Sequence, residues 1–243
     1  MIFSIYKKAF DALLKRPIRL WGISLLCGVL SIIATAAFAI LPAAVYVINL
    51  LLCASMSMIY LTFYRTRVEP KAADLFYAFK KERFGRIAGG LAWRDLWIFL
   101  WALIPIVGIV FAFIRIYEYC FTPYILLTRE DVSATEAIKI SKKETMGLKG
   151  KMFWADILIS LMFSAAVLIL GLFSQIPYVG VLFTIIYAVA TILYYLLYPL
   201  FIGLVHAAFY EERDSLKAAP AAPVAPAAPE IPETPAETTL PNN

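Results

Sequence analysis

Long apolar stretches alternate with shorter polar segments along the chain up to about residue 210. About 20 consecutive apolar residues cross the hydrocarbon core of a bilayer, which is about 30 Å thick. Each apolar stretch here is about twice as long as one crossing and is interrupted near its middle by an uncharged turn that contains proline. The sequence therefore predicts an all-α membrane fold with six transmembrane helices in three proline-turn hairpins, over residues 20–41, 43–64, 86–104, 108–127, 153–174 and 179–204.

Proline and glycine mark the predicted turns. The first turn lies around Pro42, the second over residues 104–108 and the third over residues 176–180, and the last two share the pattern Ile-Pro-x-Val-Gly. Proline ends a helix because it has no backbone N–H to donate, and glycine then reverses the chain at little steric cost. Turns this short leave no room for a receptor domain on the outer face of a membrane.

A polar segment precedes each hairpin, and we interpret it as a cytoplasmic, interfacial amphipathic helix. In residues 1–17, apolar residues recur at helical spacing on one face and basic residues occupy the opposite face. The second segment covers about residues 71–86, and the third begins with the capping box Ser133-Ala134-Thr135-Glu136 and ends near residue 148. Residues 80–82 and 142–144 both have the sequence Lys-Lys-Glu, which favours a repeated unit of surface helix and hairpin.

Basic residues predict the orientation of the chain in the membrane. The lysines and arginines that flank the apolar stretches all fall on the same side of the predicted hairpins. Because such residues stay in the cytoplasm during insertion, both termini are expected to be cytoplasmic. The absence of organellar targeting features favours the bacterial cytoplasmic (inner) membrane. Residues 20–41 are too long for the core of a cleavable signal, although the alanines of residues 34–39 resemble a cleavage site.

The chain divides into three predicted parts: residues 1–17 as an interfacial helix, residues 18–210 as a six-helix transmembrane domain, and residues 211–243 as a disordered cytoplasmic tail. The tail is rich in alanine and proline, and such a segment cannot bury enough apolar surface to order itself. It is either a solubilising tail or a docking strand for a partner that recognises proline-rich segments.

Composition narrows the possible partners. Apolar residues make up 62% of the chain, against about 45–50% in a soluble domain, so lipid is the expected solvent. The net charge of +5 is explained by basic residues that flank the spans and attract anionic lipid headgroups. No segment is long enough to form a basic soluble domain, which argues against a nucleic-acid partner.

Four charged residues fall inside the second predicted hairpin, and they are the candidate site. Arg94 and Asp95 are roughly 15 Å from Pro105 along one helix, and Arg115 and Glu118 are roughly 15–20 Å from it along the other. All four are therefore expected near the middle of the bilayer. Arg115 is then within reach of Asp95 across the hairpin, and Arg94 within reach of Glu118; Arg115 and Glu118 also share a helical face at i, i+3.

This charged cluster has three possible explanations. Ionisable residues inside a span face protein or water and often mark a pathway, so the cluster is either a structural clamp or a polar cavity for an ion, proton or headgroup. The third explanation is a different span, because residues 96–114 are uncharged and long enough for one crossing. That assignment would place the basic residues between 129 and 151 outside the cell, against the charge rule.

The sequence offers little support for an enzyme, a metal site or a cofactor. The three cysteines are odd in number and lack CxxC spacing, and the one histidine, His206, cannot form a metal site alone. No nucleophile elbow, zincin motif, phosphate loop or dinucleotide fingerprint occurs. Spacing leaves open a dyad of His206 with Ser160 or Ser164, but no flanking feature supplies an oxyanion hole. We predict a non-enzymatic protein without a cofactor.

Several short motifs, in order along residues 70–212, give the chain a resemblance to a known family. They are Asp74-Leu75-Phe76-Tyr77-Ala78-Phe79-Lys80, Trp101-Ala102-Leu103-Ile104-Pro105, Thr122-Pro123-Tyr124-Ile125-Leu126, Ala137-Ile138-Lys139-Ile140-Ser141-Lys142 with Met146-Gly147, and Pro199 with Ala207-Ala208-Phe209-Tyr210. On these motifs the chain resembles a bacterial integral membrane family known as domain of unknown function nine-seven-five. The resemblance implies a polytopic membrane protein and adds no mechanism, because the family has no settled activity.

Two functions from different classes follow. The first is an inner-membrane protein whose cytoplasmic helices organise membrane lipid or a protein partner. The alternative is a small transporter that uses Arg94, Asp95, Arg115 and Glu118 as its substrate or ion pathway. Neither prediction fixes an oligomeric state.

Overall fold

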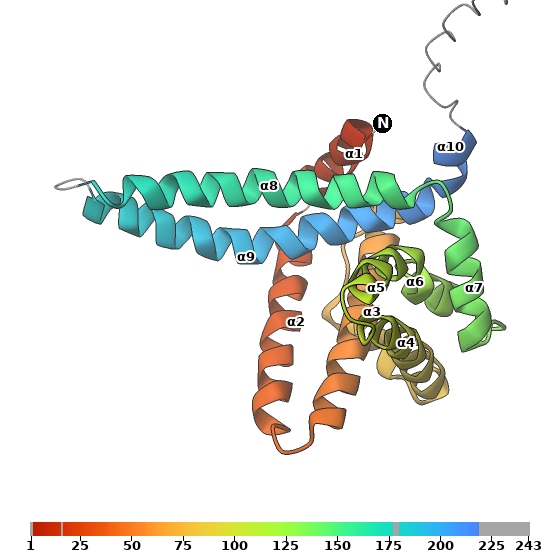
Figure 1. The fold of residues 1–243 in the computed structure, drawn as a ribbon. Helices are drawn as coiled ribbons and strands as arrows, with labels where there is room; N and C mark the ends of the chain where they lie inside the picture. The colour runs from red at the N-terminus through yellow and green to blue at the C-terminus, as the bar shows by residue number, and fades with distance from the viewer. Residues whose placement is uncertain (1, 16, 177–179, 219–243) are drawn as a thin grey trace, which may run out of the picture.

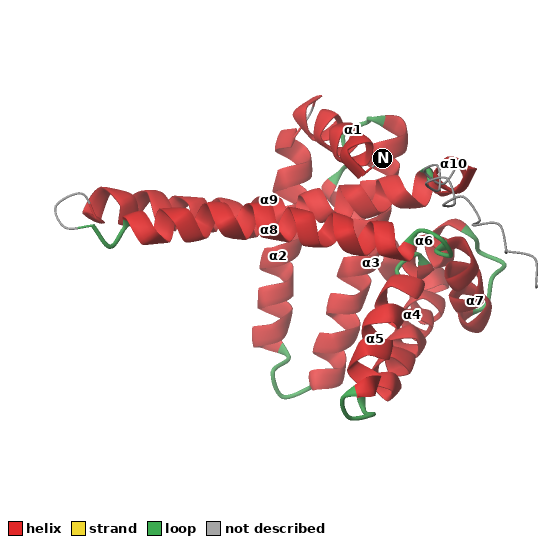
Figure 2. Ribbon diagram, turned by 45° about the horizontal axis from the view of Figure 1, so that its top comes forward, coloured by secondary structure: helices red, strands yellow, loops and turns green. Residues whose placement is uncertain are grey.

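The computed structural model describes residues 2–15, 17–176 and 180–218, and every regular element in this part of the chain is helical (Figures 1 and 2). The elements, in order, are α1 (Ile2–Lys15), α2 (Pro17–Ala37), α3 (Pro42–Thr66), the 3-10 helix η1 (Ala72–Phe79), α4 (Lys81–Ala102), α5 (Val107–Glu118), α6 (Thr122–Thr128), α7 (Ala134–Glu144), α8 (Lys149–Phe173), α9 (Gly180–Glu211) and α10 (Arg213–Ala218).

One continuous core holds these helices together, and we call the part of the molecule that contains it the basal layer. It comprises α1, η1, α6, α7 and α10 with the adjoining ends of α2, α3, α4, α8 and α9. Buried residues run through the second half of α3, through α6 and through the end of α9, from Leu200 to Tyr210. The densest packing therefore lies where the helices converge.

Three helical pairs extend from the basal layer as apolar arms. They cover residues 24–49, residues 92–117, and residues 160–176 together with 180–199. Apolar side chains along these arms are largely exposed, including Ile32, Phe113 and Leu168. The first two arms lie beside each other, with the loops that end them on the same side of the molecule, whereas the α8–α9 arm runs across their direction (Figures 1 and 2). An apolar surface of this extent is suited to lipid rather than water.

Five stretches in the described part of the chain are long and apolar enough to cross a membrane: residues 18–37, 42–66, 107–128, 149–173 and 180–211. These correspond to five of the six predicted spans. The predicted span at residues 86–104 lies in α4, which is not among them. Lys81 begins α4, so this helix combines the end of the predicted surface segment with the predicted span, and its buried residues, from Ile87 to Leu91, lie in its first half.

The predicted span at residues 108–127 is interrupted. Helix α5 ends at Glu118, and α6 begins at Thr122, with Pro123 in its first turn. In a continuous helix, the ring of Pro123 would clash with the carbonyl group of residue 119, four positions earlier. The 12 residues of α5 extend for only about 18 Å, which is less than the hydrocarbon thickness. The interruption brings the end of the second arm back into the basal layer.

A single crossing over residues 96–114 is wrong, because α4 ends at Ala102 and α5 begins at Val107. The two helices pack against each other with a tight turn between them. Gly108 is required there, since a Cβ atom at this position would lie 2.1 Å from the carbonyl oxygen of Trp101.

The predicted surface segments form three different structures. The first is helix α1, which buries Ile5, Ala9 and Ala12 and exposes Lys7 and Lys8. The second is mostly the 3-10 helix η1. The third is α7, where Ser133 and Glu136 form the predicted capping box, but α7 ends at Glu144, earlier than expected. The expected repeat is not reproduced locally, because residues 80–82 lead into α4 whereas residues 142–144 end α7.

The predicted tail boundary moves towards the C-terminus. Glu211 is the last residue of α9, and residues 213–218 form α10, which packs on α9. A disordered segment from residue 211 is therefore wrong for these residues. The remainder of the predicted tail, residues 219–243, and the middle of the third predicted turn, residues 177–179, lie outside the described residues.

Candidate functional site

The four predicted charged residues pair within their own helices. Arg94 and Asp95 of α4 form an ion pair with 2.6 Å between Nη2 and Oδ1, and Arg115 and Glu118 of α5 form the i, i+3 pair that their spacing predicts. The expected pairs across the hairpin, Arg115 with Asp95 and Arg94 with Glu118, are absent from the described structure. The cluster is thus divided into two sites.

Arg94 and Asp95 line a cavity of about 630 Å³ between α3, α4, α5, α6 and α9. Its other polar lining residues are Ser57, Cys53, Cys120 and His206. Asp95 accepts a 2.8 Å hydrogen bond from the hydroxyl of Tyr46 in addition to its ion pair with Arg94. The cavity has the size of a small-ligand site and opposite charges at one wall, which suits a neutral or zwitterionic polar molecule.

Arg115 and Glu118 do not line this cavity. Glu118 is only 5% exposed, and its second carboxylate oxygen accepts a 2.5 Å hydrogen bond from Lys149, the first residue of α8. Arg115 also lies over the ring of Trp101, 5.1 Å from the ring centroid. The carboxylate of Glu118 therefore joins the end of α5 to the start of α8, which sets it apart from Arg94 and Asp95.

The backbone of Glu118 completes this junction. The last carbonyl groups of a helix have no partner within the helix, and α5 ends at Glu118. Two hydroxyl groups of the next surface segment donate to the Glu118 carbonyl oxygen, Ser141 at 2.8 Å and Thr145 at 3.2 Å. Both hydroxyls are buried, so Glu118 connects α5, α7 and α8 at one point. This arrangement is that of a structural clamp.

A second polar cluster, which the sequence interpretation missed, lies between α5, α8 and α9. Asp156 of α8 lies 3.0 Å from Nε2 of His206 on α9, and it accepts a 3.1 Å hydrogen bond from the hydroxyl of Tyr117 on α5. The signal in the sequence was Asp156 itself, a lone carboxylate in an apolar stretch. His206 also lines the charged cavity and therefore connects it to Asp156.

The possible serine dyad is not formed. His206 interacts with Asp156, whereas the hydroxyl of Ser160 lies 2.6 Å from the hydroxyl of Tyr198. Within the described residues, no group of three or more histidine, cysteine, aspartate or glutamate side chains is arranged to hold a metal ion. In the cavity, the hydroxyl of Ser57 donates to the carbonyl oxygen of Cys53, and the sulfur of Cys120 lies 3.9 Å from the sulfur of Met152.

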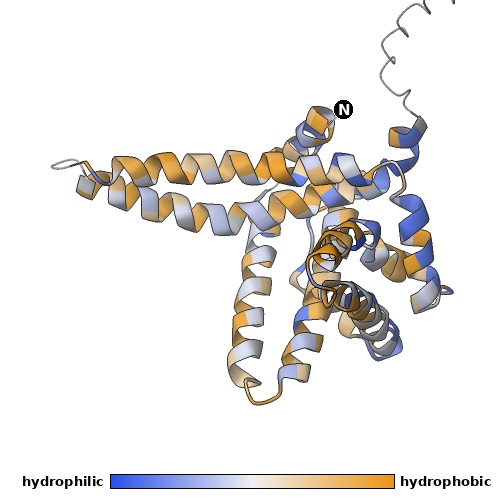
Figure 3. Cartoon of the chain, in the orientation of Figure 1, coloured by the Kyte–Doolittle hydropathy of each residue, from blue (hydrophilic) through white to orange (hydrophobic). Residues whose placement is uncertain are grey.

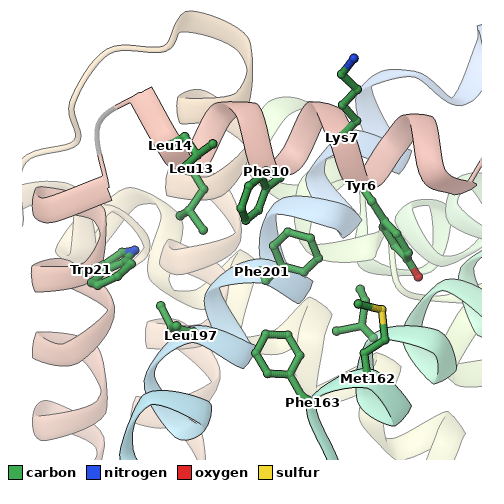
Figure 4. Close-up of a pocket in the computed structure, with 11 residues that line it drawn as sticks. Tyr6, Lys7, Phe10, Leu13, Leu14, Trp21, Met162, Phe163, Leu197 and Phe201 are labelled. Carbon is green, nitrogen blue, oxygen red and sulfur yellow. The ribbon is translucent and has the colours of Figure 1, made fainter. Parts of the chain in front are cut away.

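A second cavity, of about 600 Å³, lies beneath α1, and we call it the α1 groove (Figure 4). Its lining is almost entirely apolar and includes Phe10 and Leu13 of α1, Trp21 of α2, Met162 and Phe163 of α8, and Phe201 of α9. The aromatic side chains from α1 and α9 point towards each other across it, while the amine of Lys7 points away on the outer side of α1 (Figure 4).

Comparison with known proteins does not assign either site, because no protein family, no curated protein and no solved structure matches the chain.

Proposed function

We propose that the chain is a non-enzymatic, multi-pass protein of the bacterial inner membrane that organises lipid or a protein partner at the cytoplasmic face. In this proposal both termini are cytoplasmic, and the three arms form the predicted hairpins. Membership of the family that the sequence resembles is part of the same proposal. The observation that carries it is the division of the molecule into apolar arms and one polar-edged basal layer (Figure 3).

Ion pairs support the interpretation of the basal layer as a preassembled surface. Lys8 of α1 binds Glu212 at 2.6 Å, and Arg65 of α3 binds Glu211 of α9 at 2.6 Å. Glu144 of α7 binds Arg129 at 2.9 Å and Arg213 of α10 at 3.1 Å. Partly exposed pairs of this kind contribute little to stability. They do fix the relative positions of segments that are distant in sequence, as a docking surface requires.

The third arm has to align with the other two if all three cross one bilayer. Pro199 lies inside α9, next to the change from its exposed half to its buried half at Leu200. Proline removes one backbone hydrogen bond from a helix interior, and helices bend at such positions. We propose that α9 changes direction there in the membrane while residues 200–210 stay in the core.

Deletion of a docking element tests the organiser function. We expect removal of residues 1–17, or of residues 218–243, to eliminate a protein or lipid that copurifies with the intact chain from native membranes. The reason is that α1 lies at the edge of the basal layer, and that residues 218–243 continue the chain from α10, which packs on α9 there. The measurement is affinity purification followed by identification of proteins and lipids. An unchanged set of copurifying molecules after both deletions would contradict the proposal.

The charged cavity favours transport as the second candidate function. Arg94, Asp95 and His206 line it together, and transport would need the cavity to open to water from at least one side. Two cysteines lie in the same lining, Cys53 and Cys120, whereas Cys27 does not. These positions allow a direct test of water access.

Single-cysteine variants distinguish the two functions. We expect Cys120, with the other two cysteines replaced by alanine, to remain unmodified by a membrane-impermeant, charged thiol reagent, because an organiser needs no aqueous path. Chains that keep only Cys27 provide the control for background reaction. The measurement is the mass of the protein after treatment of sealed membranes. Rapid modification of Cys120, blocked in Asp95→Asn, would support transport and contradict the organiser function.

A further inference from the structure

We infer that the α1 groove binds one acyl chain of an anionic glycerophospholipid from the surrounding bilayer, with its headgroup beside Lys7. This inference rests on the proposed function, since it assumes that the arms lie in lipid, and it specifies which lipid the basal layer holds. The shape of the groove, the attachment of α1 above it and the charge at its outer edge all favour this ligand.

The groove is a half-open space between several helices rather than the flat face of one helix. Helix α1 forms its roof and is attached above it at two points. The hydroxyl of Tyr6 donates a 2.5 Å hydrogen bond to the carbonyl oxygen of Ala155 on α8, and Lys8 binds Glu212. The rings of Tyr6 and Phe10 lie 6.1 and 6.5 Å from the ring of Phe201 on α9. The roof is therefore held at a fixed position over α8 and α9.

The lining of the groove selects for a hydrocarbon chain. Its volume of about 600 Å³ falls within the range of small-ligand sites, and nearly all of the surface inside it is carbon. A polar or charged ligand would lose its hydration there without compensation. An acyl chain has no hydration to lose when it moves from the bilayer into the groove. It gains dispersion contacts with the close-packed aromatic side chains there.

A basic residue at the groove favours a lipid with a negative headgroup. Lys7 is exposed on the outer side of α1 and has no ion-pair partner among the described residues. A basic residue at a membrane surface attracts anionic lipid.

The matched test uses two neighbouring residues of α8. Met162 lines the groove and is 67% exposed, whereas Leu161 is 63% exposed and does not line it. Tryptophan at Met162 would fill the groove, while tryptophan at Leu161 would face the surrounding lipid. The full-length chain is purified, incubated with equal amounts of phosphatidylglycerol and phosphatidylcholine, and examined by native mass spectrometry. Equal thermal unfolding midpoints establish that both variants are folded.

We expect one phosphatidylglycerol molecule to remain bound to the unaltered chain and to Leu161→Trp, and its occupancy to fall about tenfold in Met162→Trp. We expect Lys7→Gln to reduce the preference for phosphatidylglycerol about fivefold, with Lys139→Gln, another exposed lysine, unchanged. If the occupancy of phosphatidylglycerol falls equally in both tryptophan variants, the bound molecule is lipid from the general surface of the protein. That result would overturn the inference. If the chain retains phosphatidylglycerol and phosphatidylcholine equally, the groove does not prefer a negative headgroup, and the inference of an anionic ligand is wrong.

Another outcome would identify a different occupant. A dimer of the unaltered chain that dissociates in Met162→Trp would make the groove an interface between two copies and overturn lipid binding. The organiser function is tested separately by deletion of residues 218–243, which leaves α1 in the chain. If Met162→Trp leaves lipid occupancy unchanged while this deletion still eliminates a copurifying protein, only the groove inference is wrong.

Discussion

Glu118→Ala is expected to lower the free energy of unfolding by about 3–5 kcal/mol, because it removes the shared partner of two cations at a buried position. The carboxylate is 5% exposed and binds both Arg115 and Lys149. Alanine would leave both cations without their partner at the point where three helices meet. The measurement is the thermal unfolding midpoint of the purified chain in detergent, together with its yield from membranes.

Two variants provide the comparison for Glu118→Ala. Glu118→Gln keeps one acceptor oxygen, for either Arg115 or Lys149, and replaces the other oxygen with an NH2 donor while removing the negative charge, so an intermediate loss is expected. Glu130→Ala also breaks an ion pair, with Arg83, but the side chain of Glu130 is 66% exposed. The loss there is expected to be below about 1 kcal/mol. Equal unfolding midpoints for Glu118→Ala and Glu130→Ala would show that the clamp at the end of α5 stabilises the fold no more than an exposed ion pair does.

Gly203→Ala is expected to destabilise the fold by about 1–3 kcal/mol through overpacking. A Cβ atom at residue 203 would lie 2.2 Å from Cε2 of Tyr60, where α9 crosses α3 in the core. Tyr60 is buried, so its ring has little room to move. Alanine is normally the better helix former, so a loss of stability identifies the close approach as the cause. The measurement is again the thermal unfolding midpoint.

A double variant and a control test this explanation. Tyr60→Leu removes the ring edge, so stability lost in Gly203→Ala is expected to be partly recovered in the double variant. Gly150→Ala changes a helical glycine with no neighbouring atom within 4 Å, and it is expected to leave the midpoint unchanged or raise it. A loss at Gly150 as large as that at Gly203 would point to backbone effects instead of packing.

Much of the local structure follows directly from sequence patterns. The apolar stretches predict most of α2, α3, α8 and α9, and the capping box predicts the start of α7. The i, i+3 spacing predicts the pair of Arg115 with Glu118. These features depend on a few neighbouring residues and on helical periodicity, so a sequence contains the information needed to recognise them.

The candidate site was only partly predictable. The sequence predicts that Glu118 lies in the middle of one continuous helix over residues 108–127, within reach of Arg94. In the structure the helix is interrupted before Thr122, and Glu118 lies beside Lys149. Pro123 was a local signal for that interruption. No local signal predicts that Arg94 pairs with its neighbour Asp95, because the choice between partners depends on the distance between α4 and α5.

The sequence by itself determines that this chain is helical and suited to lipid, because 62% apolar composition and long apolar stretches allow no other solvent for so much surface. Only the tertiary structure decided which partners and which cavities its charged residues have. Arg94 and Asp95 line a cavity, Glu118 clamps three helices, and His206 meets Asp156 across 50 positions of sequence. Contacts of this kind depend on helix crossings, which the packing of the whole chain sets and no local pattern encodes.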